Sequence, residues 1–453
     1  MKSIRIGSGA GYAGDRVEPA VALIEHGDLD YIIFECLAER TIAIAQQEKL
    51  RDPEAGYNGL LPYRMERVIP AIKNRRVRIV SNMGAANPIG AARKILEIAR
   101  KHGLSKLKIA AITGDDVVGR LDKFLHLETL ETHTTLSTLR DKVISANAYT
   151  GAQKITEALE AGADIVITGR TADPALALGP IMHEFGHSFD DYDFIGKGIA
   201  AGHLLECGSQ VMGGYFADPG YKIVPELWNV GFPIIEMSRD GAITIQKLPS
   251  AGGLVSEATV KEQLLYEIHD PHEYLTPDGI ADFSKIAVTQ TGDNKVLVEN
   301  ATGRERTHLL KVSVGYQDGY IGEGEISYGG SGASLRAQLA AEIIRRRFEL
   351  IGLKLQELRL DLIGVNSLFG ETLRQKLDPD RRDEEYRDVR LRVAGRATTE
   401  DDARTIGREV EALYTNGPAG GGGARAYVRQ ILSIASVLIP EHEVTETISY
   451  FEL

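Results

Sequence analysis

The chain has 453 residues, and its 52 Lys and Arg against 64 Asp and Glu give a formal net charge of −12. This acidic balance argues against sequence-independent nucleic-acid binding, which requires a basic face. Only two cysteines, Cys36 and Cys207, are present, which excludes a disulfide framework, and no run of about 18 apolar residues predicts a membrane span. We therefore expect a cytoplasmic protein with neither nucleic-acid nor membrane partners.

The first half of the sequence alternates short apolar runs with helical patterns. The runs have the continuous apolar character of strands that are buried on both faces. They are Ile4–Ile6, Tyr31–Phe34, Val77–Val80, Lys108–Ile112, Val143–Ser145 and Ile165–Ile167. Alternation of this kind predicts an α/β fold with a parallel sheet that is flanked by helices.

The second half changes character. Asp240-Gly241 predicts a hairpin turn between two strands, and the segment from residue 307 to 330 alternates, with turn residues in its middle. Two strong helical patterns follow, at residues 335–352 and after a Thr398 or Thr399 cap, with two predicted strands between them. We therefore expect an α/β domain at residues 1–282 and a smaller α+β domain at residues 283–453.

Polar side chains follow the predicted parallel strands at the points where these strands end. In open α/β sheets, ligands bind at the carboxyl ends of the strands. The side chains at these positions are Glu35, Asn82, Asp115, Asn147 and Arg170. Polar turns also serve as simple connections, but the recurrence of amides and charges predicts a pocket at this edge.

Gly9, Gly11 and Gly14 form a G-x-G-x-x-G pattern after the first predicted strand, and Glu35 ends the next strand. This spacing is typical of a dinucleotide-binding loop. Pro19, however, favours the first turn of a helix, so the loop is longer than in that motif. We expect a phosphate or carboxylate contact at this loop, with a dinucleotide as the less favoured alternative.

The segment 183–187 reads HEFGH, the H-E-x-x-H pattern of zinc peptidases. Zinc binding by this pattern needs both imidazoles on one helical face. Gly186 is a natural helix stop, so we expect His187 to fall outside the helix. A zinc peptidase is therefore disfavoured, while a metal site of another kind stays open.

His203, Glu206 and Cys207 lie within five residues of one small-residue helix. His203 and Glu206 share a helical face because they are three residues apart. This set predicts a pocket helix, and the alternative is a packed cysteine beside a solvated ion pair. Cys36 is expected to be an inert core residue.

Four consecutive glycines, Gly420–Gly423, stand between two stretches that are predicted as helices. A helix N-terminus presents unpaired N–H groups and a partial positive charge. We therefore expect Gly421, Gly422 and Arg425 to hold an anion such as a phosphate or a carboxylate. A tight turn or a mobile lid is the alternative.

Long segments of the chain carry a family resemblance. They read IRIGSGAGYAGDR, YIIFECLAERT, SNMGAANP, ITGDD, NAYTGA, GADIVITGRTADPALALGP, AGHLLECG and NGPAGGGGA. These segments resemble the acyclic terpene utilisation (AtuA-like) family over nearly the whole chain. The resemblance implies a role in bacterial catabolic gene clusters, including one for citronellol and geraniol breakdown. It also implies action on branched acyl-CoA intermediates, for example as a 3-hydroxy-3-isohexenylglutaryl-CoA lyase, but it supplies no catalytic residues.

We therefore expect an enzyme, of lyase or hydrolase type, that acts on a small branched carboxylic acid or its CoA thioester. The predicted acid–base residues are Glu35, Asp115, Asp116, His203 and Glu206. The predicted groups for an anionic substrate are Gly9, Gly11, Asn82, Asn147, Arg170, Asp173, Gly421, Gly422 and Arg425. Asp173 is expected to orient Arg170, whose guanidinium suits a bidentate grip, or to cap its helix.

Several alternatives stay open at this point. A divalent metal, if one is used, is expected on Asp115, Asp116 and Glu35 rather than on His183 and His187. CoA is expected only as part of the substrate. A non-catalytic ligand-binding or assembly subunit and a metal-dependent hydrolase are the alternative functions, and a homo-oligomer is the expected assembly.

Overall fold

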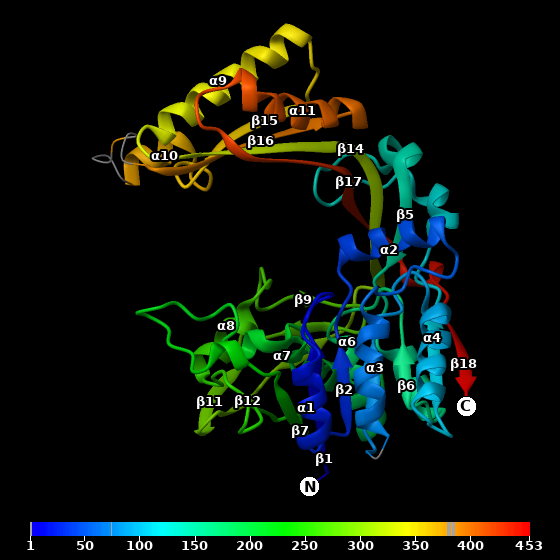
Figure 1. Ribbon diagram of the computed structural model, residues 1–453. Coiled ribbons are helices and arrows are strands. Elements are labelled where there is room, and N and C mark those ends of the chain that lie inside the picture. Colours follow the sequence, from blue (N-terminus) through cyan, green and yellow to red (C-terminus); the bar gives the residue numbers. More distant parts are fainter. Residues whose placement is uncertain (1, 74, 378–381, 383–385) are drawn as a thin grey trace. The chain divides into compact units, whose positions relative to one another are not determined.

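The computed structural model describes residues 2–73, 75–377, 382 and 386–453. Within this part, the chain forms two compact units, one of Met1–Tyr316 with Ile434–Leu453 and one of Gln317–Ser433 (Figure 1). The sequence predicts a boundary between two domains at residue 282, and this boundary stays a prediction. The compact units divide the chain at different places.

The first unit is built on a ten-stranded mixed sheet. Its strands, in spatial order, are β11 (Ala287–Gly292), β12 (Lys295–Glu299), β8 (Ile243–Gln246), β7 (Ile234–Ser238), β1 (Ser3–Ala10), β2 (Tyr31–Phe34), β3 (Arg78–Ser81), β6 (Ile165–Ile167), β4 (Lys108–Thr113) and β18 (Thr447–Glu452). The central strands β1, β2, β3, β6 and β4 are parallel, and the outer ones are antiparallel. The chain is therefore a mixed α/β protein, and the parallel pairs that its sequence predicts lie at the centre of this sheet.

Successive residues of the central strands enter two separate cores, because side chains alternate between the faces of a sheet. Ile32 and Phe34 of β2 belong to one core, and Tyr31 and Ile33 belong to the other. The first core includes α1 (Glu18–His26), α3 (Leu61–Ile72) and α4 (Pro88–Lys101). The second includes α5 (Gln153–Glu160), α6 (Ala175–Phe185) and α7 (Tyr192–Glu206).

The remaining elements of the first unit surround the carboxyl ends of the parallel strands or the edges of the sheet. They are α2 (Glu39–Arg51), α8 (Glu257–Leu265), and a small sheet of β9 (Tyr274–Leu275), β10 (Ile280–Asp282) and β13 (Thr302–Arg304), with short 3₁₀ segments between the main elements.

One predicted strand lies in a different sheet from the one expected. The run at 143–145 becomes β5 (Val143–Ala148), which pairs antiparallel with β14 (Leu309–Gly329), with Asn147 opposite Ser313. The prediction that this strand joins the parallel sheet is therefore wrong. An apolar run specifies burial but not a partner, and here the partner lies more than a hundred residues away in the sequence.

The second unit contains four strands of a five-stranded sheet whose fifth strand is β5, and two of the unit's three helices pack on these strands. Its strands are β15 (Glu357–Ile363), β16 (Asp388–Ala397), β14 and β17 (Gly422–Pro440), and its helices are α9 (Ala333–Ile351), α10 (Gly370–Leu377) and α11 (Glu400–Asn416). The predicted Thr399 cap is confirmed, since its side chain accepts the N–H of Asp402. The predicted turn within residues 307–330 is absent, because β14 runs through it as one strand.

The glycine run leads into a strand and not into a helix. Strand β17 begins at Gly422, whereas a helix was expected there. Gly420 and Gly423 adopt left-handed φ values of 73° and 66°, which a turn between α11 and a strand requires. The helix N-terminus on which the predicted anion site rested does not exist, so the binding roles of Gly421, Gly422 and Arg425 remain predictions without that support.

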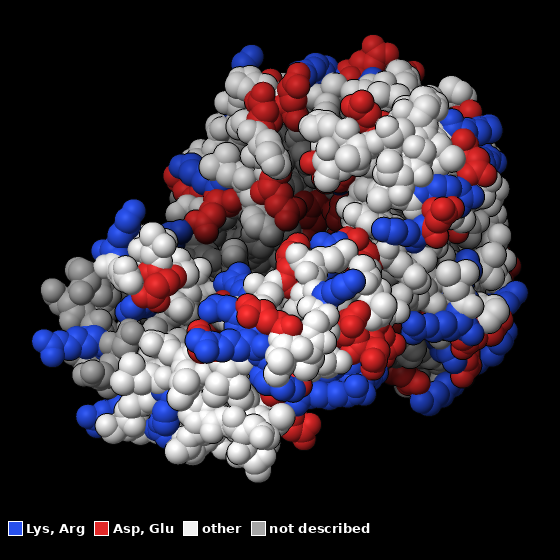
Figure 2. Space-filling view, turned by 90° about the horizontal axis from the view of Figure 1, so that it is seen from above, with Lys and Arg blue, Asp and Glu red and all other residues white. Residues whose placement is uncertain are grey.

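The surface carries charges of both signs. Figure 2 shows acidic and basic side chains interspersed on one face of the molecule. In the described part of the chain, no helix combines the length and the apolar character that crossing a membrane requires.

Candidate functional site

A cavity of about 700 Å³ opens at the carboxyl ends of the parallel strands, within the first unit. Gly11 follows β1, Glu35 follows β2 and Arg170 follows β6, and all three line this cavity. Its volume lies in the range of small-molecule sites, about 300–1,000 Å³. We call it the candidate cavity.

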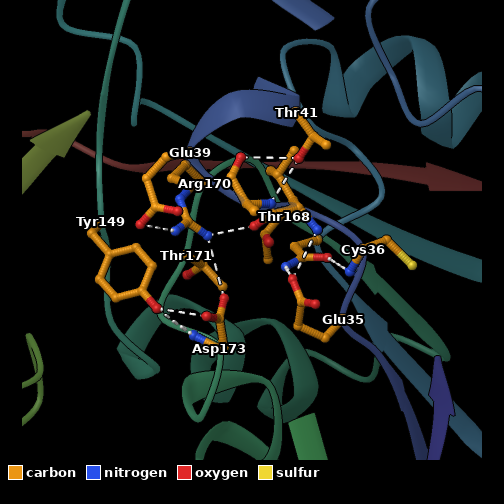
Figure 3. A network of polar contacts seen from close by, with 12 residues as sticks. Glu35, Cys36, Glu39, Thr41, Tyr149, Thr168, Arg170, Thr171 and Asp173 are labelled. Atoms are coloured by element: carbon orange, nitrogen blue, oxygen red, sulfur yellow. Dashed lines mark hydrogen bonds and ion pairs between the residues drawn. The ribbon is translucent and has the colours of Figure 1, made fainter. Parts of the chain in front are cut away.

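Arg170 is the centre of a buried polar network in this cavity (Figure 3). Its guanidinium is 2 % exposed and donates to the carbonyl of Leu37, to Asp173 Oδ1 at 3.3 Å and to Glu39 Oε1 at 3.1 Å. Burial disfavours the charge, but the two carboxylates outweigh it and raise the pKa of Arg170. Its Nε, in contrast, is buried and has no hydrogen-bond partner among the described residues.

Tyr149 and Asp173 form a reciprocal pair beside the guanidinium. The Tyr149 hydroxyl donates to Asp173 Oδ2 at 2.9 Å and accepts the backbone N–H of Asp173 at 3.1 Å. Burial raises the pKa of Asp173, although Arg170 and Tyr149 oppose this rise. No side chain caps α6 at its first turn, so the predicted capping role of Asp173 is wrong, and its predicted contact with Arg170 is present.

Glu35 is held in the cavity wall by one of its two oxygens. Its Oε1 accepts the N–H of Leu37 at 2.8 Å and the amide of Asn82 at 3.1 Å. Burial, followed by the nearby Asp173 charge, raises the pKa of Glu35 to about 8. At neutral pH this carboxyl group is therefore protonated and able to donate. Asn82 lies behind Glu35 rather than in the lining of the cavity.

His203 and Glu206 act as a unit that shares one proton. His203 Nε2 donates to the carbonyl of Gln263 at 2.9 Å, and Nδ1 lies 2.7 Å from Glu206 Oε1. Burial lowers the pKa of His203, but Glu206 outweighs this and raises it, while burial raises the pKa of Glu206 to about 7 against the effect of His203. Glu206 Oε2 has no hydrogen-bond partner in the described part of the chain. Both residues line the candidate cavity, and while both ring nitrogens of His203 are engaged, Oε2 of Glu206 is buried without a hydrogen bond to any described residue.

Eight predicted site residues do not line the candidate cavity: Gly9, Asn82, Asp115, Asp116, Asn147, Gly421, Gly422 and Arg425. Asp115 is buried and accepts the amide of Asn147 at 2.8 Å and the N–H of Arg170 at 2.9 Å, and burial raises its pKa to about 6. Asp116 accepts from Gln46 at 3.0 Å. These groups hold the turn that carries Arg170, and direct roles for Asp115, Asp116 and Asn147 in binding or catalysis stay predictions.

The two predicted glycines differ in their positions. Gly11 lines the candidate cavity, and an added Cβ would lie 2.4 Å from the carbonyl carbon of Cys207. Gly9 lies within β1, where a Cβ would lie 2.6 Å from the ring of Phe34. The strand therefore needs Gly9 for packing, while Gly11 allows the loop to approach the end of α7. As expected for a loop longer than a dinucleotide-binding turn, α1 begins only at Glu18.

The candidate metal ligands do not form a coordination group. In the part of the chain that the structure describes, no cluster of three or more His, Cys, Asp or Glu side chains could hold a metal ion. As predicted, α6 ends at Phe185 and Gly186 is left-handed, with a φ of 68°. His183 accepts from Arg78 at 3.0 Å, and His187 contacts Asp191 at 2.8 Å.

Several lining residues were missed by the sequence reasoning. Glu39 begins α2 four residues after Glu35, and Tyr149 directly follows β5, so their positions shortly after strands were the available signal. Lys311 comes from β14, and its ammonium lies 3.2 Å from Glu39 Oε1. Burial would raise the pKa of Glu39, but Arg170 and Lys311 outweigh it and lower this pKa to about 2. Glu39 therefore remains ionised.

The candidate cavity also has an apolar part that is open to solvent. Four leucines from separate segments line it, and each is between 40 % and 57 % exposed. They are Leu130, Leu275, Leu309 and Leu438. The cavity therefore combines ionisable groups at the strand ends with an exposed aliphatic surface.

The fold and this cavity define a mixed α/β protein with acid–base groups gathered at the carboxyl ends of its parallel strands. A family model described as "Acyclic terpene utilisation family protein AtuA" matches residues 4–450, and the chain belongs to this family. The family is implicated in acyclic terpene utilisation, a catabolic pathway. Searches of curated proteins and of solved structures found no match.

Proposed function

We propose that the chain is a catabolic enzyme that acts by acid–base chemistry on a branched carboxylic acid or its CoA thioester, by carbon–carbon cleavage. The observation that carries this proposal is that two buried carboxyl groups, Glu35 and Glu206, line one cavity, where burial raises the pKa of each. Perturbed groups that converge in a pocket are typical of catalytic sites. A binding subunit has no need for such values.

The two carboxyl groups suit cleavage of a 3-hydroxyacyl compound. Glu206, through its unpartnered Oε2, takes the proton of the substrate hydroxyl as the C2–C3 bond breaks and C3 becomes a ketone. The electron pair of the broken bond moves onto C2 as an enolate, which takes a proton from Glu35. No oxidant or reductant is needed, and exchange with solvent returns the proton from Glu206 to Glu35.

The rest of the lining suits the remainder of such a substrate. The four exposed leucines would contact a branched alkyl chain. Lys311, whose side chain is 41 % exposed, keeps access to solvent, and we assign it to the anionic end. Arg170 would position Glu39 and Asp173 rather than bind the substrate itself.

The test uses the purified full chain with a panel of branched 3-hydroxyacids and their CoA thioesters. Ketone and acyl products are followed by mass spectrometry, and binding is followed by thermal shift. Turnover by the wild type, and its loss in Glu206→Gln and Glu35→Gln, is the expected result. Glu97→Gln, which changes an exposed glutamate paired with Lys94, is the matched control and should retain activity.

Two outcomes would contradict the proposal. Binding of panel members without turnover of any of them would favour a ligand-binding subunit of the pathway. Turnover that survives in both Glu206→Gln and Glu35→Gln would leave an enzyme but remove these two residues from its chemistry.

A further inference from the structure

A second cavity of the first unit, of about 650 Å³, lies at the opposite ends of the same parallel strands. Its lining includes Tyr31 and Arg78, the first residues of β2 and β3, together with Leu107 just before β4 and Asp164 just before β6. The candidate cavity is lined by residues that follow these strands. The two cavities therefore lie at opposite ends of the parallel strands.

Cationic side chains outnumber carboxylates in this second cavity, which we call the basic cavity. Its cations are Lys73, Arg75, Arg76, Arg78 and Lys106, and its carboxylates are Asp30, Asp164 and Glu184. This local excess of positive charge occurs in a chain whose formal net charge is −12. The balance of the whole chain therefore does not explain it.

The three carboxylates are already engaged at the strand ends. Asp30 accepts the N–H of Arg5 at 2.8 Å, and Asp164 accepts the N–H of Lys108 at 2.8 Å. Glu184 accepts the hydroxyl of Tyr31 at 2.8 Å and pairs with Lys2 at 3.1 Å. None of these contacts involves a cation of the basic cavity.

The cations fall into two groups. Lys73 donates to the carbonyl of His102 after the end of α4, a common position for a lysine, and Arg78 donates to Tyr31 and His183. Arg75, Arg76 and Lys106 are exposed, and their side chains have no hydrogen bond or ion pair with any described residue. Like charges in one cavity repel each other, and an anion would relieve this repulsion.

We propose that the basic cavity binds a small molecule that carries two or more phosphate groups, such as a nucleoside diphosphate. Arginine and lysine are the side chains that bind phosphate oxygens, and three unpartnered cations match the charge of a diphosphate. The volume suits a molecule of nucleotide size rather than a single ion. The proposal does not depend on the reaction at the candidate cavity.

Isothermal titration at low ionic strength tests this proposal with ADP, inorganic phosphate and adenosine. The wild type should bind ADP more tightly than phosphate and should not bind adenosine, and its affinity for ADP should fall as salt is added. The triple variant Arg75→Ala/Arg76→Ala/Lys106→Ala should bind ADP at least tenfold more weakly. The triple variant Arg93→Ala/Arg239→Ala/Lys295→Ala removes the same charge from exposed positions and should bind within about twofold of the wild type.

Three results would overturn the proposal. They are no binding of ADP or phosphate by the wild type, equal weakening in the two triple variants, and binding of adenosine as tightly as ADP. Because salt dependence is measured on the wild type, the proposal can fail even if a variant does not fold.

Discussion

The arginines at the two ends of the parallel strands differ in burial and in pairing. At the carboxyl ends, Arg170 is almost fully buried and is surrounded by acceptors of the chain itself. At the amino ends, Arg75 and Arg76 are exposed and have no acceptor among the described residues. A buried charge must be paired within the fold, whereas an exposed charge stays available to a ligand. The same sheet thus offers a preorganised site at one end and an adaptable one at the other.

The largest effect is expected from removing the base at the carboxyl ends. Glu206→Gln keeps the shape of the side chain but cannot accept the substrate proton, so turnover should fall about 100- to 10,000-fold. Product formation under saturating substrate measures it. His203→Gln should cause a smaller loss, because both residues line the cavity but the proposed base is Glu206, with which His203 shares a proton; an equal loss would show that the proton transfer needs both residues equally.

The next largest effect tests the buried network. Arg170→Met leaves Asp173 without its cation and Glu39 with Lys311 alone, and it should lower the free energy of unfolding by about 3–5 kcal/mol. Urea denaturation measures the change. Arg93→Met, at an exposed position, serves as the control, and similar stabilities of the two variants would refute the idea that this network stabilises the fold.

A steric change at the same end should have an intermediate effect. Gly11→Ala brings a Cβ within 2.4 Å of the backbone of Cys207, which should cost about 1–3 kcal/mol because backbone cannot move away easily. Gly59→Ala meets nothing within 4 Å and is the matched control. Equal melting temperatures for both variants would show that the loop tolerates displacement.

The pH dependence of stability reports the raised carboxyl pKa values. Between about pH 5 and 8, the folded chain binds more protons than the unfolded chain, because the pKa of Glu35 rises from 4.5 to about 8. The free energy of unfolding should therefore fall as pH rises, by at most about 1.4 kcal/mol per pH unit for this group. Glu35→Gln should flatten the profile measured by urea denaturation at several pH values. If the profiles of the wild type and of Glu35→Gln have the same slope, the pKa of Glu35 lies near its ordinary value.

The smallest effect is expected at the amino ends. Arg75→Ala/Arg76→Ala should change the free energy of unfolding by no more than about 0.5 kcal/mol, because exposed side chains without partners contribute little. The measurement is made without phosphate and repeated with ADP, which should stabilise only the wild type. A large loss without ligand would mean that these arginines serve the fold.

Local signals in the sequence were sufficient to predict the ends of several helices and strands. Pro19 correctly places the start of α1, Gly186 correctly ends α6, and the Asp240-Gly241 turn correctly joins β7 and β8. Each signal acts through the conformation of a few neighbouring residues. The rule that polar side chains directly after strands mark a pocket likewise selected Glu35 and Arg170, and both line one cavity.

Long-range pairing could not be predicted from such signals. The residues after Gly423 include Ala424, Arg425 and Ala426, which favour helices, but pairing with β14 makes them part of a strand. Lys311 and Leu438 reach the candidate cavity from segments that are distant in the sequence. The sequence therefore predicted the residues at the strand ends, while the rest of the lining depends on tertiary structure.

Strand β18 has a consequence for synthesis of the chain. It pairs with β4, with Thr447 opposite Thr113. In the sequence, residues 317–433, which form the second unit, come between these two strands. On the ribosome, the nascent first unit therefore emerges with the outer edge of β4 uncovered, and this edge stays uncovered until β18 is translated. Exposed strand edges pair with other strands, so we expect the growing polypeptide to be open to pairing with other chains during this interval.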